Sequence, residues 1–247
     1  MARRQYHLGC ARGDAAPRLL LCGDPQRAGR VARWFSSVRL ERRHREFATI
    51  TGMWKGREVT VVGTGIGPDN TEIAVLELSR IVRDPVFLRI GTSGALRRGI
   101  RLGDLVISTG AVRLENTSTF YVPEGYPAVA HHEVVGALIG ACRDLRLRHH
   151  VGLTATAPGF YGAQSRRVPG FEPRYRDLPG ELGRLNVLNL EMEVSALLTL
   201  ASVGGFRAGA VCAVYAQRAT GRFAGPALRA RSERDLIRAG LTALERL

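Results

Sequence analysis

Apolar residues along this chain form two alternating patterns. Short β-rich runs bounded by glycine or proline are typical of buried strands, and they occupy residues 19–22, 57–63, 86–90, 105–112, 150–157 and 207–216. Between these runs the apolar residues recur at helical spacing. The clearest helix is predicted to begin at Asp69 or Asn70 and to bury Ile73, Leu76 and Ile81. Strands and helices therefore alternate along the whole chain.

This alternation predicts an α/β fold, a single-domain three-layer α/β/α arrangement with a central mixed β-sheet over residues 1–247. The composition is that of a globular domain, because 45% of the 247 residues are hydrophobic and 23% are charged. The long stretch 162–183 is rich in glycine, proline and charge. We expect it to be a functional or partly disordered loop.

Glycine-rich and polar segments follow three of the predicted strands. Gly23 opens a turn before a helix in which Asp24 fits the N-cap and Pro25 the first turn. The segments 63–67 and 91–94 follow two further strands. Ligands of α/β sheets bind beyond the carboxyl ends of the strands. One site built from several strand ends is therefore expected.

Arg89 lies at the end of an apolar run that otherwise predicts a buried strand. A buried guanidinium is costly unless it is paired, so an anionic group of the protein or of a ligand should meet it. Turns at helix N-termini bind phosphate through backbone amides, and arginines add charge-assisted contacts. Arg27 and Arg45 are further candidates, although each one alone is better explained as a solvated surface residue.

The net charge of +14 suggests nucleic-acid binding, but the distribution of the charge argues against it. Lys55 is the only lysine among the 36 basic residues, and the arginines are spread along the whole chain. No helix-turn-helix, zinc-finger or aromatic–basic RNA motif is present. No run approaches the roughly 18 apolar residues of a membrane helix. We therefore expect neither a nucleic acid nor a membrane as partner.

The cysteines Cys10, Cys22, Cys142 and Cys212 have no metal-like spacing, and we expect buried free thiols in a reducing cytoplasm. The N-terminus lacks the apolar segment of a signal peptide. Neither pair of adjacent histidines has the spacing of a metalloenzyme motif, so no metal ligands are predicted. The glycines of segment 63–67 do not fit a dinucleotide-binding fingerprint, so no nicotinamide or flavin cofactor is expected.

Eight segments together resemble the hexameric nucleoside phosphorylase family, the group of purine and uridine phosphorylases. They are YHLG at 6–9, GDPQR at 23–27, HREF at 44–47, GTGIG at 63–67, LRIGTSGA at 88–95, GFYGAQSR at 159–166, EMEVSALL at 191–198 and QRATG at 217–221. They occur in the family's order over nearly the whole chain. The resemblance implies a nucleoside phosphorylase-like fold and inorganic phosphate as a co-substrate, with no cofactor.

The resemblance also implies a role for each matching residue. The phosphate-binding positions are Gly23, Arg27, Arg45, Arg89 and Thr92, with Arg45 supplied by a neighbouring subunit. The ribose contacts are Glu191, Met192, Glu193 and the neighbour's His7, and the base contacts are Phe160, Gln164, Arg166 and Arg218. Catalysis is expected to depend on Arg89, Glu193, Gln164 and Arg166. The implied assembly is a homo-oligomer, with a dimer as minimal active unit and a hexamer as the whole.

The implied reaction is attack of phosphate on the anomeric carbon of uridine, which yields uracil and ribose 1-phosphate through a transition state with oxocarbenium character. A pyrimidine is favoured because Arg218 stands where purine enzymes of the family have an aspartate. The arginines at 27, 45 and 89 favour phosphorolysis over hydrolysis. A purine nucleoside phosphorylase or nucleosidase, and a non-catalytic binding protein, are the alternatives. The sequence does not separate uridine from deoxyuridine or thymidine.

Several positions depart from the family's pattern. Glu46 and Ile66 match a monovalent-cation site at the subunit interface, but Asn70 replaces a serine there, so a K⁺ site is only an option. Ala163 and Ser165 stand at positions of the GFYGAQSR segment that look variable, so the resemblance leaves the fine specificity open. Tyr215 replaces a smaller aliphatic residue near the base, and we expect it to narrow the pocket.

Overall fold

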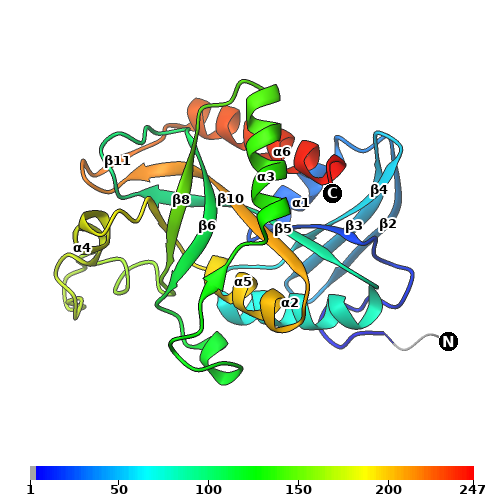
Figure 1. The fold of residues 1–247 in the computed structure, drawn as a ribbon, viewed down its shortest axis with the longest axis horizontal. Helices are drawn as coiled ribbons and strands as arrows, with labels where there is room; N and C mark the ends of the chain where they lie inside the picture. The colour runs from blue at the N-terminus through cyan, green and yellow to red at the C-terminus, as the bar shows by residue number, and fades with distance from the viewer. Residues whose placement is uncertain (1–3) are drawn as a thin grey trace.

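An eleven-stranded mixed sheet forms the middle layer of the structure, a computed structural model that describes residues 4–247 (Figure 1). Its strands are β1 (Arg18–Cys22), β2 (Ser37–His44), β3 (Phe47–Trp54), β4 (Arg57–Gly63), β5 (Val86–Ala95), β6 (Leu105–Arg113), β7 (Ala128–Val129), β8 (His149–Thr156), β9 (Asn189–Glu191), β10 (Arg207–Gln217) and β11 (Arg222–Phe223). The helices are α1 (Pro25–Ala32), α2 (Pro68–Ile81), α3 (His132–Asp144), α4 (Leu178–Arg184), α5 (Val194–Val203) and α6 (Pro226–Glu245), with a 3₁₀ helix at Thr117–Phe120.

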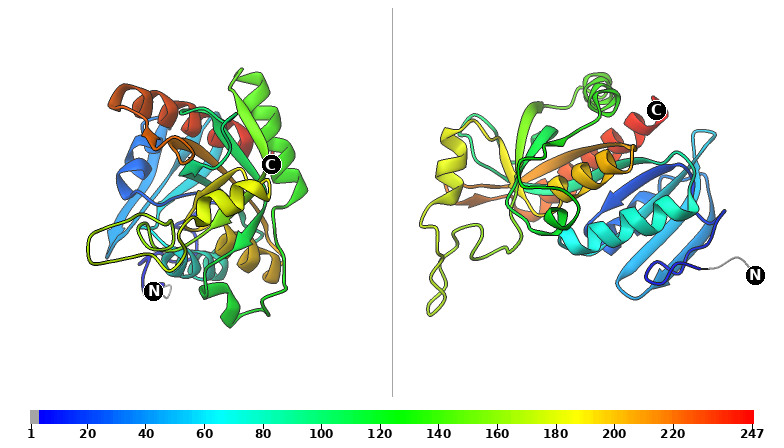
Figure 2. Two further views of the ribbon diagram at one scale, coloured as in Figure 1. Left: turned by 90° about the vertical axis from the view of Figure 1, so that its left-hand side faces the viewer. Right: turned by 60° about the horizontal axis from the view of Figure 1, so that its bottom comes forward.

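Successive residues of the central strands point into two different hydrophobic cores. On one face of the sheet, Leu20 and Ile90 pack with α1, α3 and α6. On the other face, Leu21 and Phe87 pack with α2 and α5. Figures 1 and 2 show these helices on the two sides of the sheet. The predicted three-layer fold with a mixed sheet is therefore confirmed, and all four cysteines are buried and free as expected.

Part of the sheet closes on itself. β10 pairs with β5 on one edge and with β6 on the other, β6 pairs with β8, β8 pairs with β9, and β9 returns to the end of β5. These five strands form a ring of pairings. β1, β4, β3 and β2 extend from the first half of β5 as an open sheet. β5 is thus shared by the closed and the open parts.

Three strand predictions are corrected by the structure. β5 continues through its glycines to Ala95, because β10 pairs with it over this whole length, so Arg89 lies within the strand and not at its end. β2 and β3 were not predicted from the apolar pattern. β2 is mostly exposed and carries several charged side chains, so it has no apolar run to reveal it.

The helix boundaries need corrections as well. α2 begins at Pro68, with Gly67 at the N-cap in place of the predicted Asp69 or Asn70, because proline suits the first helical position. The last part of the predicted long loop forms α4. Glu191, predicted at a helix start, is the last residue of β9, and Glu193 holds the N-cap position of α5. None of the helices within residues 4–247 is both long and apolar enough to cross a lipid bilayer.

Two helical glycines give a test of how closely the layers pack. A Cβ atom at Gly240 of α6 would lie 2.7 Å from Ile90 Cγ2 and 3.1 Å from Leu20 Cδ1, whereas a Cβ atom at Gly29 of α1 would meet nothing within 4 Å. We expect Gly240→Ala to cost about 1–3 kcal/mol of stability through overpacking. Gly29→Ala should add up to about 1 kcal/mol through helix propensity. Thermal unfolding of the two variants measures these changes in stability. Equal shifts of the two melting temperatures would contradict the close packing of α6 against the sheet at Gly240.

Candidate active site

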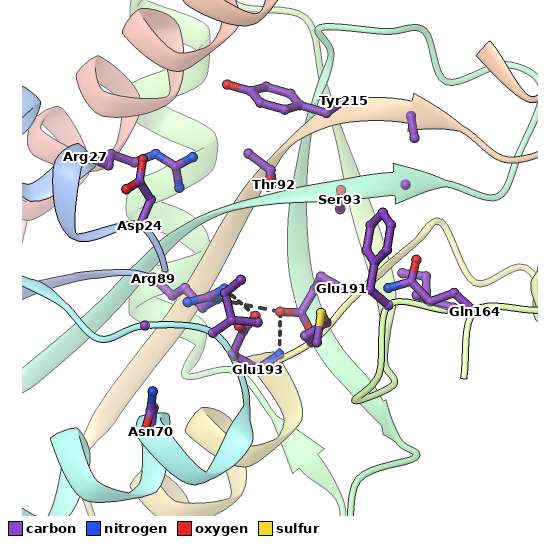
Figure 3. Close-up of a pocket in the computed structure, with 18 of the residues that line it drawn as sticks. Asp24, Arg27, Asn70, Arg89, Thr92, Ser93, Gln164, Glu191, Glu193 and Tyr215 are labelled. Carbon is purple, nitrogen blue, oxygen red and sulfur yellow. Dashed lines mark hydrogen bonds and ion pairs between the residues drawn. The ribbon is translucent and has the colours of Figure 1, made fainter. Parts of the chain in front are cut away.

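A cavity opens where β5 loses a neighbouring strand on one edge. β1 pairs with β5 as far as Arg89, and β9 pairs with it from Gly94 onward. Thr92 and Ser93 lie between these two pairings and line a cavity of about 900 Å³ (Figure 3). Breaks of this kind at the strand ends of α/β sheets are where ligands bind. The strand pairing itself therefore creates the site.

Segments distant in the sequence line this cavity. They include the turns after β1 and β4, the second half of β5, the loop after β8, the turn before α5 and the end of β10. The predicted site residues among the lining are Gly23, Arg27, Glu46, Ile66, Asn70, Arg89, Thr92, Phe160, Gln164, Arg166, Glu191, Met192, Glu193 and Tyr215. Their proximity is a fact of the structure, and their individual roles stay predictions.

Three predicted site residues do not line the cavity of their own chain. Arg45 is exposed in the turn between β2 and β3, with its guanidinium carbon 4.6 Å from the centre of the Tyr6 ring. His7 Nδ1 lies 2.9 Å from a carboxylate oxygen of Glu77. Arg218 lies behind the loop after β8, where its Nη2 donates to the backbone oxygen of Gln164 at 2.7 Å.

Arg27 lies at one end of the cavity and is buried, contrary to its interpretation as a surface residue when taken alone. Its Nε donates to Glu233 of α6 at 2.7 Å, and its Nη1 donates to the backbone oxygen of Ile90 at 3.3 Å. Glu233 and Asp24 also accept from Arg30. Each guanidinium at this end thus already has a carboxylate partner.

Arg89 resolves the question raised by a charged residue in a buried strand. It follows Phe87 on the face of α2 and α5, because side chains alternate along a strand. There its Nη2 donates to Glu193 at 2.5 Å, and its Nε lies 3.6 Å from Glu191. Glu193 also accepts from the backbone N–H of Gly67 at 2.8 Å, at the start of α2. The partner of Arg89 within the chain is therefore a carboxylate.

Glu191 is held by the backbone around it. Its carboxylate accepts from the N–H groups of Glu193 and Val194 at 2.8 and 2.9 Å and from Thr156 Oγ1 at 2.6 Å. Burial and the charge of Glu193 raise the pKa of Glu191 to about 7, against the opposing effect of Arg89. Burial by itself would lower the pKa of Arg89, but the negative charges of Glu193 and Glu191 outweigh it, so the pKa of Arg89 is raised. Arg89 supplies one positive charge to two carboxyl groups, so Glu191, whose pKa is raised, tends to keep its proton.

Two aromatic rings and Arg166 form the other end of the cavity. The guanidinium carbon of Arg166 lies 4.0 Å from the ring centre of Phe160 and 5.4 Å from that of Phe223. Its Nη2 is 3.5 Å from Gln164 Oε1. Burial and the charge of Arg218 lower the pKa of Arg166. This end offers an amide and a cation between apolar surfaces, which suits a flat polar ring.

Several lining residues were missed by the sequence analysis. Phe223 comes from the short β11, and Ser93 follows Thr92 directly on β5. Glu233, which holds Arg27, lies in the final helix, far away in sequence. Ser93 could have been found from its neighbour Thr92, but nothing local marks Phe223 or Glu233. Tyr215 lines the cavity, but its hydroxyl donates to the backbone oxygen of Arg229 at 3.1 Å.

The options for a bound metal ion are limited. Within the described chain, no group of three or more His, Cys, Asp and Glu side chains is arranged to hold a metal ion. Glu46 and Asn70 lie close to Gly65 at the edge of the cavity, and Ile66 is next to it in sequence. A carboxylate, an amide oxygen and backbone carbonyls are hard donors that suit a cation such as K⁺. That site stays a prediction.

Comparison with known proteins agrees with this fold and cavity. The family model for the phosphorylase superfamily matches residues 17–239. The uridine phosphorylase of Thermococcus kodakarensis is 46% identical over 221 residues, which cover 89% of this chain and 79% of that protein. The chain therefore belongs to the phosphorylase superfamily, and the resemblance seen in its sequence motifs is confirmed.

Proteins of comparable similarity to this chain carry different substrate names. The uridine phosphorylase of Escherichia coli K12 is 36% identical over 219 residues, with 86% of each chain covered. The guanosine phosphorylase of Halorubrum lacusprofundi is 35% identical over 211 residues, which cover 85% of this chain and 83% of that protein. Both pyrimidine and purine nucleosides thus appear in the names of similar proteins.

The raised pKa of Glu191 makes stability depend on pH. The folded protein keeps the Glu191 proton up to a pH of about 7, whereas the unfolded chain loses it near the ordinary pKa of 4.5. Unfolding therefore releases a proton between these values, and the free energy of unfolding falls as the pH rises through this window. Glu191→Gln removes the ionisation. We therefore expect the difference in melting temperature, Glu191→Gln minus wild type, to increase as the pH is raised from about 5 to about 8.

The control for this experiment is the exposed Glu124, whose Glu124→Gln variant should keep a constant difference from the wild type across the same pH range. If the difference in melting temperature between Glu191→Gln and the wild type did not change with pH, the raised pKa of Glu191 would be contradicted.

Proposed function

We propose that the protein is an enzyme that catalyses the reversible phosphorolysis of uridine to uracil and ribose 1-phosphate. The observation that carries this proposal is the order of chemical groups along one cavity. Figure 3 shows Arg27 and Arg89 toward one end, Glu193 near the middle and Gln164 at the other end. Arg166 lies beside Gln164, with its Nη2 3.5 Å from Gln164 Oε1. The names of the relatives from T. kodakarensis and E. coli support the same substrate.

In the proposed reaction an oxygen of phosphate forms a bond to the anomeric carbon while the bond from that carbon to the base nitrogen breaks. The electron pair of the broken bond leaves with the base. The protein supplies no nucleophile. It holds the two reactants in line and stabilises charge where it develops, which is the source of its rate enhancement. Glu193 would accept hydrogen bonds from the ribose hydroxyls.

The base end fits a uracil ring. The amide of Gln164 offers one donor and one acceptor, and the guanidinium of Arg166 offers further donors to a carbonyl oxygen. A cation beside the ring favours a base that leaves as an anion. The neighbouring Arg218 adds positive charge where a proton donor for a purine would be needed, which supports a pyrimidine. Deoxyuridine and thymidine are further substrates to be tested.

The charge balance at the phosphate end supports a homo-oligomer. Arg27 is paired with Glu233 and Arg89 with Glu193, so the cavity of one chain has little spare positive charge for a phosphate dianion. Arg45 is exposed and points its guanidinium at Tyr6, outside its own cavity. We infer that Arg45 of a neighbouring subunit completes the phosphate site and that His7 of the same neighbour reaches the sugar. A dimer is then the minimal active unit, within a hexamer.

Two smaller proposals accompany this function. The oxygens of Glu46, Ile66 and Asn70 would bind a monovalent cation near the subunit boundary. The compartment would be the cytoplasm, where a reducing environment keeps four buried thiols free.

The first test is uracil release from uridine, followed by ultraviolet absorbance with and without inorganic phosphate. We expect release to require phosphate. Arg166→Leu should lower kcat/KM for uridine by roughly 100-fold or more, because a charged hydrogen bond to the base is lost. Arg143→Leu, on the exposed face of α3, is the matched control and should leave kcat/KM unchanged. Equal release without phosphate would make the enzyme a hydrolase, and faster turnover of inosine or guanosine would favour the purine alternative.

The shared site can be tested by mixing inactive subunits. Arg45→Ala and Arg166→Leu should each be nearly inactive alone. In hybrids assembled from equal amounts of the two, about a quarter of the cavities combine an intact Arg166 with an intact Arg45 from the neighbour, so about a quarter of the wild-type activity should return. Gln164→Ala mixed with Arg166→Leu is the control and should recover nothing, since both residues belong to one cavity. Absence of recovery in the first mixture would contradict the crossing of Arg45.

A further inference from the structure

A line of buried polar side chains crosses four strands of the closed ring and ends in the cavity. Ser108 Oγ of β6 lies 2.6 Å from Thr154 Oγ1 of β8, and Thr154 Oγ1 donates to Asn189 Oδ1 of β9 at 2.8 Å. Asn189 Nδ2 then donates to Ser93 Oγ of β5 at 2.9 Å. Ser108, Thr154 and Asn189 are 0% exposed, and Ser93, which lines the cavity, is 7% exposed.

The orientation of the Asn189 amide, with Oδ1 toward Thr154 and Nδ2 toward Ser93, fixes the direction of this relay. A hydroxyl has one proton to donate. Thr154 uses its proton on Asn189, so Ser108 must donate to Thr154. Asn189 in turn fills an acceptor position of Ser93 with its amide N–H. The proton of Ser93 is therefore left over at the end of the relay, and among the hydrogen bonds of residues 4–247 Ser93 Oγ takes part only in the one from Asn189.

A polar network of this kind is costly to bury unless every member is satisfied. The hydroxyl protons of Ser108 and Thr154 are used within the protein, whereas the hydroxyl of Ser93 faces the cavity with an unused donor. The unused proton of Ser93 therefore indicates an acceptor on the ligand.

The position of Ser93 indicates which part of the ligand it meets. Its neighbour Thr92 lies toward the arginines of the phosphate end, and Figure 3 shows Ser93 between Thr92 and Gln164. Its other neighbour, Gly94, packs against Arg218 at the base end, where a Cβ atom on Gly94 would lie 3.1 Å from Arg218 Cγ. Ser93 therefore lies near the junction of sugar and base.

We propose that the Ser93 hydroxyl donates a hydrogen bond to the carbonyl oxygen of the base beside the glycosidic nitrogen, and that Asn189, Thr154 and Ser108 are positioning residues that orient it. This proposal rests on the proposed phosphorolysis. When the bond from the anomeric carbon to the base nitrogen breaks, its electron pair spreads into the base and onto this oxygen. A pre-oriented donor stabilises that charge more than it stabilises the ground state. Ser93 keeps its proton, and the base anion takes one from solvent.

The experiment compares uridine with 5-fluorouridine, whose base is the better leaving group. Ser93→Ala should lower kcat/KM for uridine by roughly 10- to 100-fold, in the range expected for loss of one hydrogen bond to a developing oxyanion. The loss should be several-fold smaller with 5-fluorouridine, because a more stable leaving anion needs less help. Ser93→Thr keeps the hydroxyl and should retain most of the activity. Ser79→Ala, on α2 and outside the cavity, should behave as the wild type with both substrates.

The relay is tested by Asn189→Asp. The new carboxylate can accept a hydrogen bond from each of its neighbours, Thr154 and Ser93, so the Ser93 hydroxyl turns its O–H toward this carboxylate and away from the cavity. We expect the same change in the ratio of the two substrates as for Ser93→Ala. If this variant does not fold, as judged by circular dichroism, the comparison of Ser93→Ala with Ser93→Thr decides the question by itself.

The outcomes separate this proposal from the proposed function. A wild-type protein that releases no base from any nucleoside would overturn both. An active wild type with an unaffected Ser93→Ala variant would overturn only the role of Ser93. An equal loss with the two substrates would also overturn it, because it would indicate a structural effect and no stabilisation of the leaving base.

Discussion

The buried cluster of Arg89, Glu193 and Glu191 is the interaction on which the site depends. It joins the middle of β5 to the end of β9 and, through Gly67, to the start of α2. Removing one charge from such a cluster leaves the others unpaired in a medium where that is costly. Three of the elements that line the cavity are therefore held together by the same charges that would meet phosphate and sugar. Binding and folding cannot be separated at this point of the structure.

The closed ring of strands explains why these charges meet. β5 has β1 beside its first half and β9 beside its end, and Thr92 and Ser93 face the cavity in the interval between these two neighbours. A continuous neighbour strand would have filled this interval with backbone hydrogen bonds. The ring also brings β6, β8 and β9 into line, which is what allows buried hydroxyl and amide groups to reach Ser93 from the far side of the sheet.

Each arginine at the end of the cavity where we propose that phosphate binds is paired with a carboxylate. Arg27 and Arg89 are fixed in place by Glu233 and Glu193 before any ligand arrives. Such preorganisation lowers the entropy lost on binding, but it also uses much of the positive charge. The further cation that we propose a neighbouring subunit supplies would restore attraction for an anion. Assembly and activity would then be linked, since a chain alone would hold a shaped but weakly attractive site.

Local patterns in the sequence were enough to predict the alternation of strands and helices, the burial of the central strands between helices and the grouping of Gly23, Arg27, Arg89 and Glu193, which line one cavity in the structure. These features depend on short-range periodicity and on motifs that are local in the chain. The tertiary structure alone decided the closure of the ring, the ion pair of Arg27 with Glu233, the second ring of Phe223 beside Arg166 and the orientation of Ser93. Each of these depends on strand register and on contacts between residues far apart in sequence, which no local pattern records.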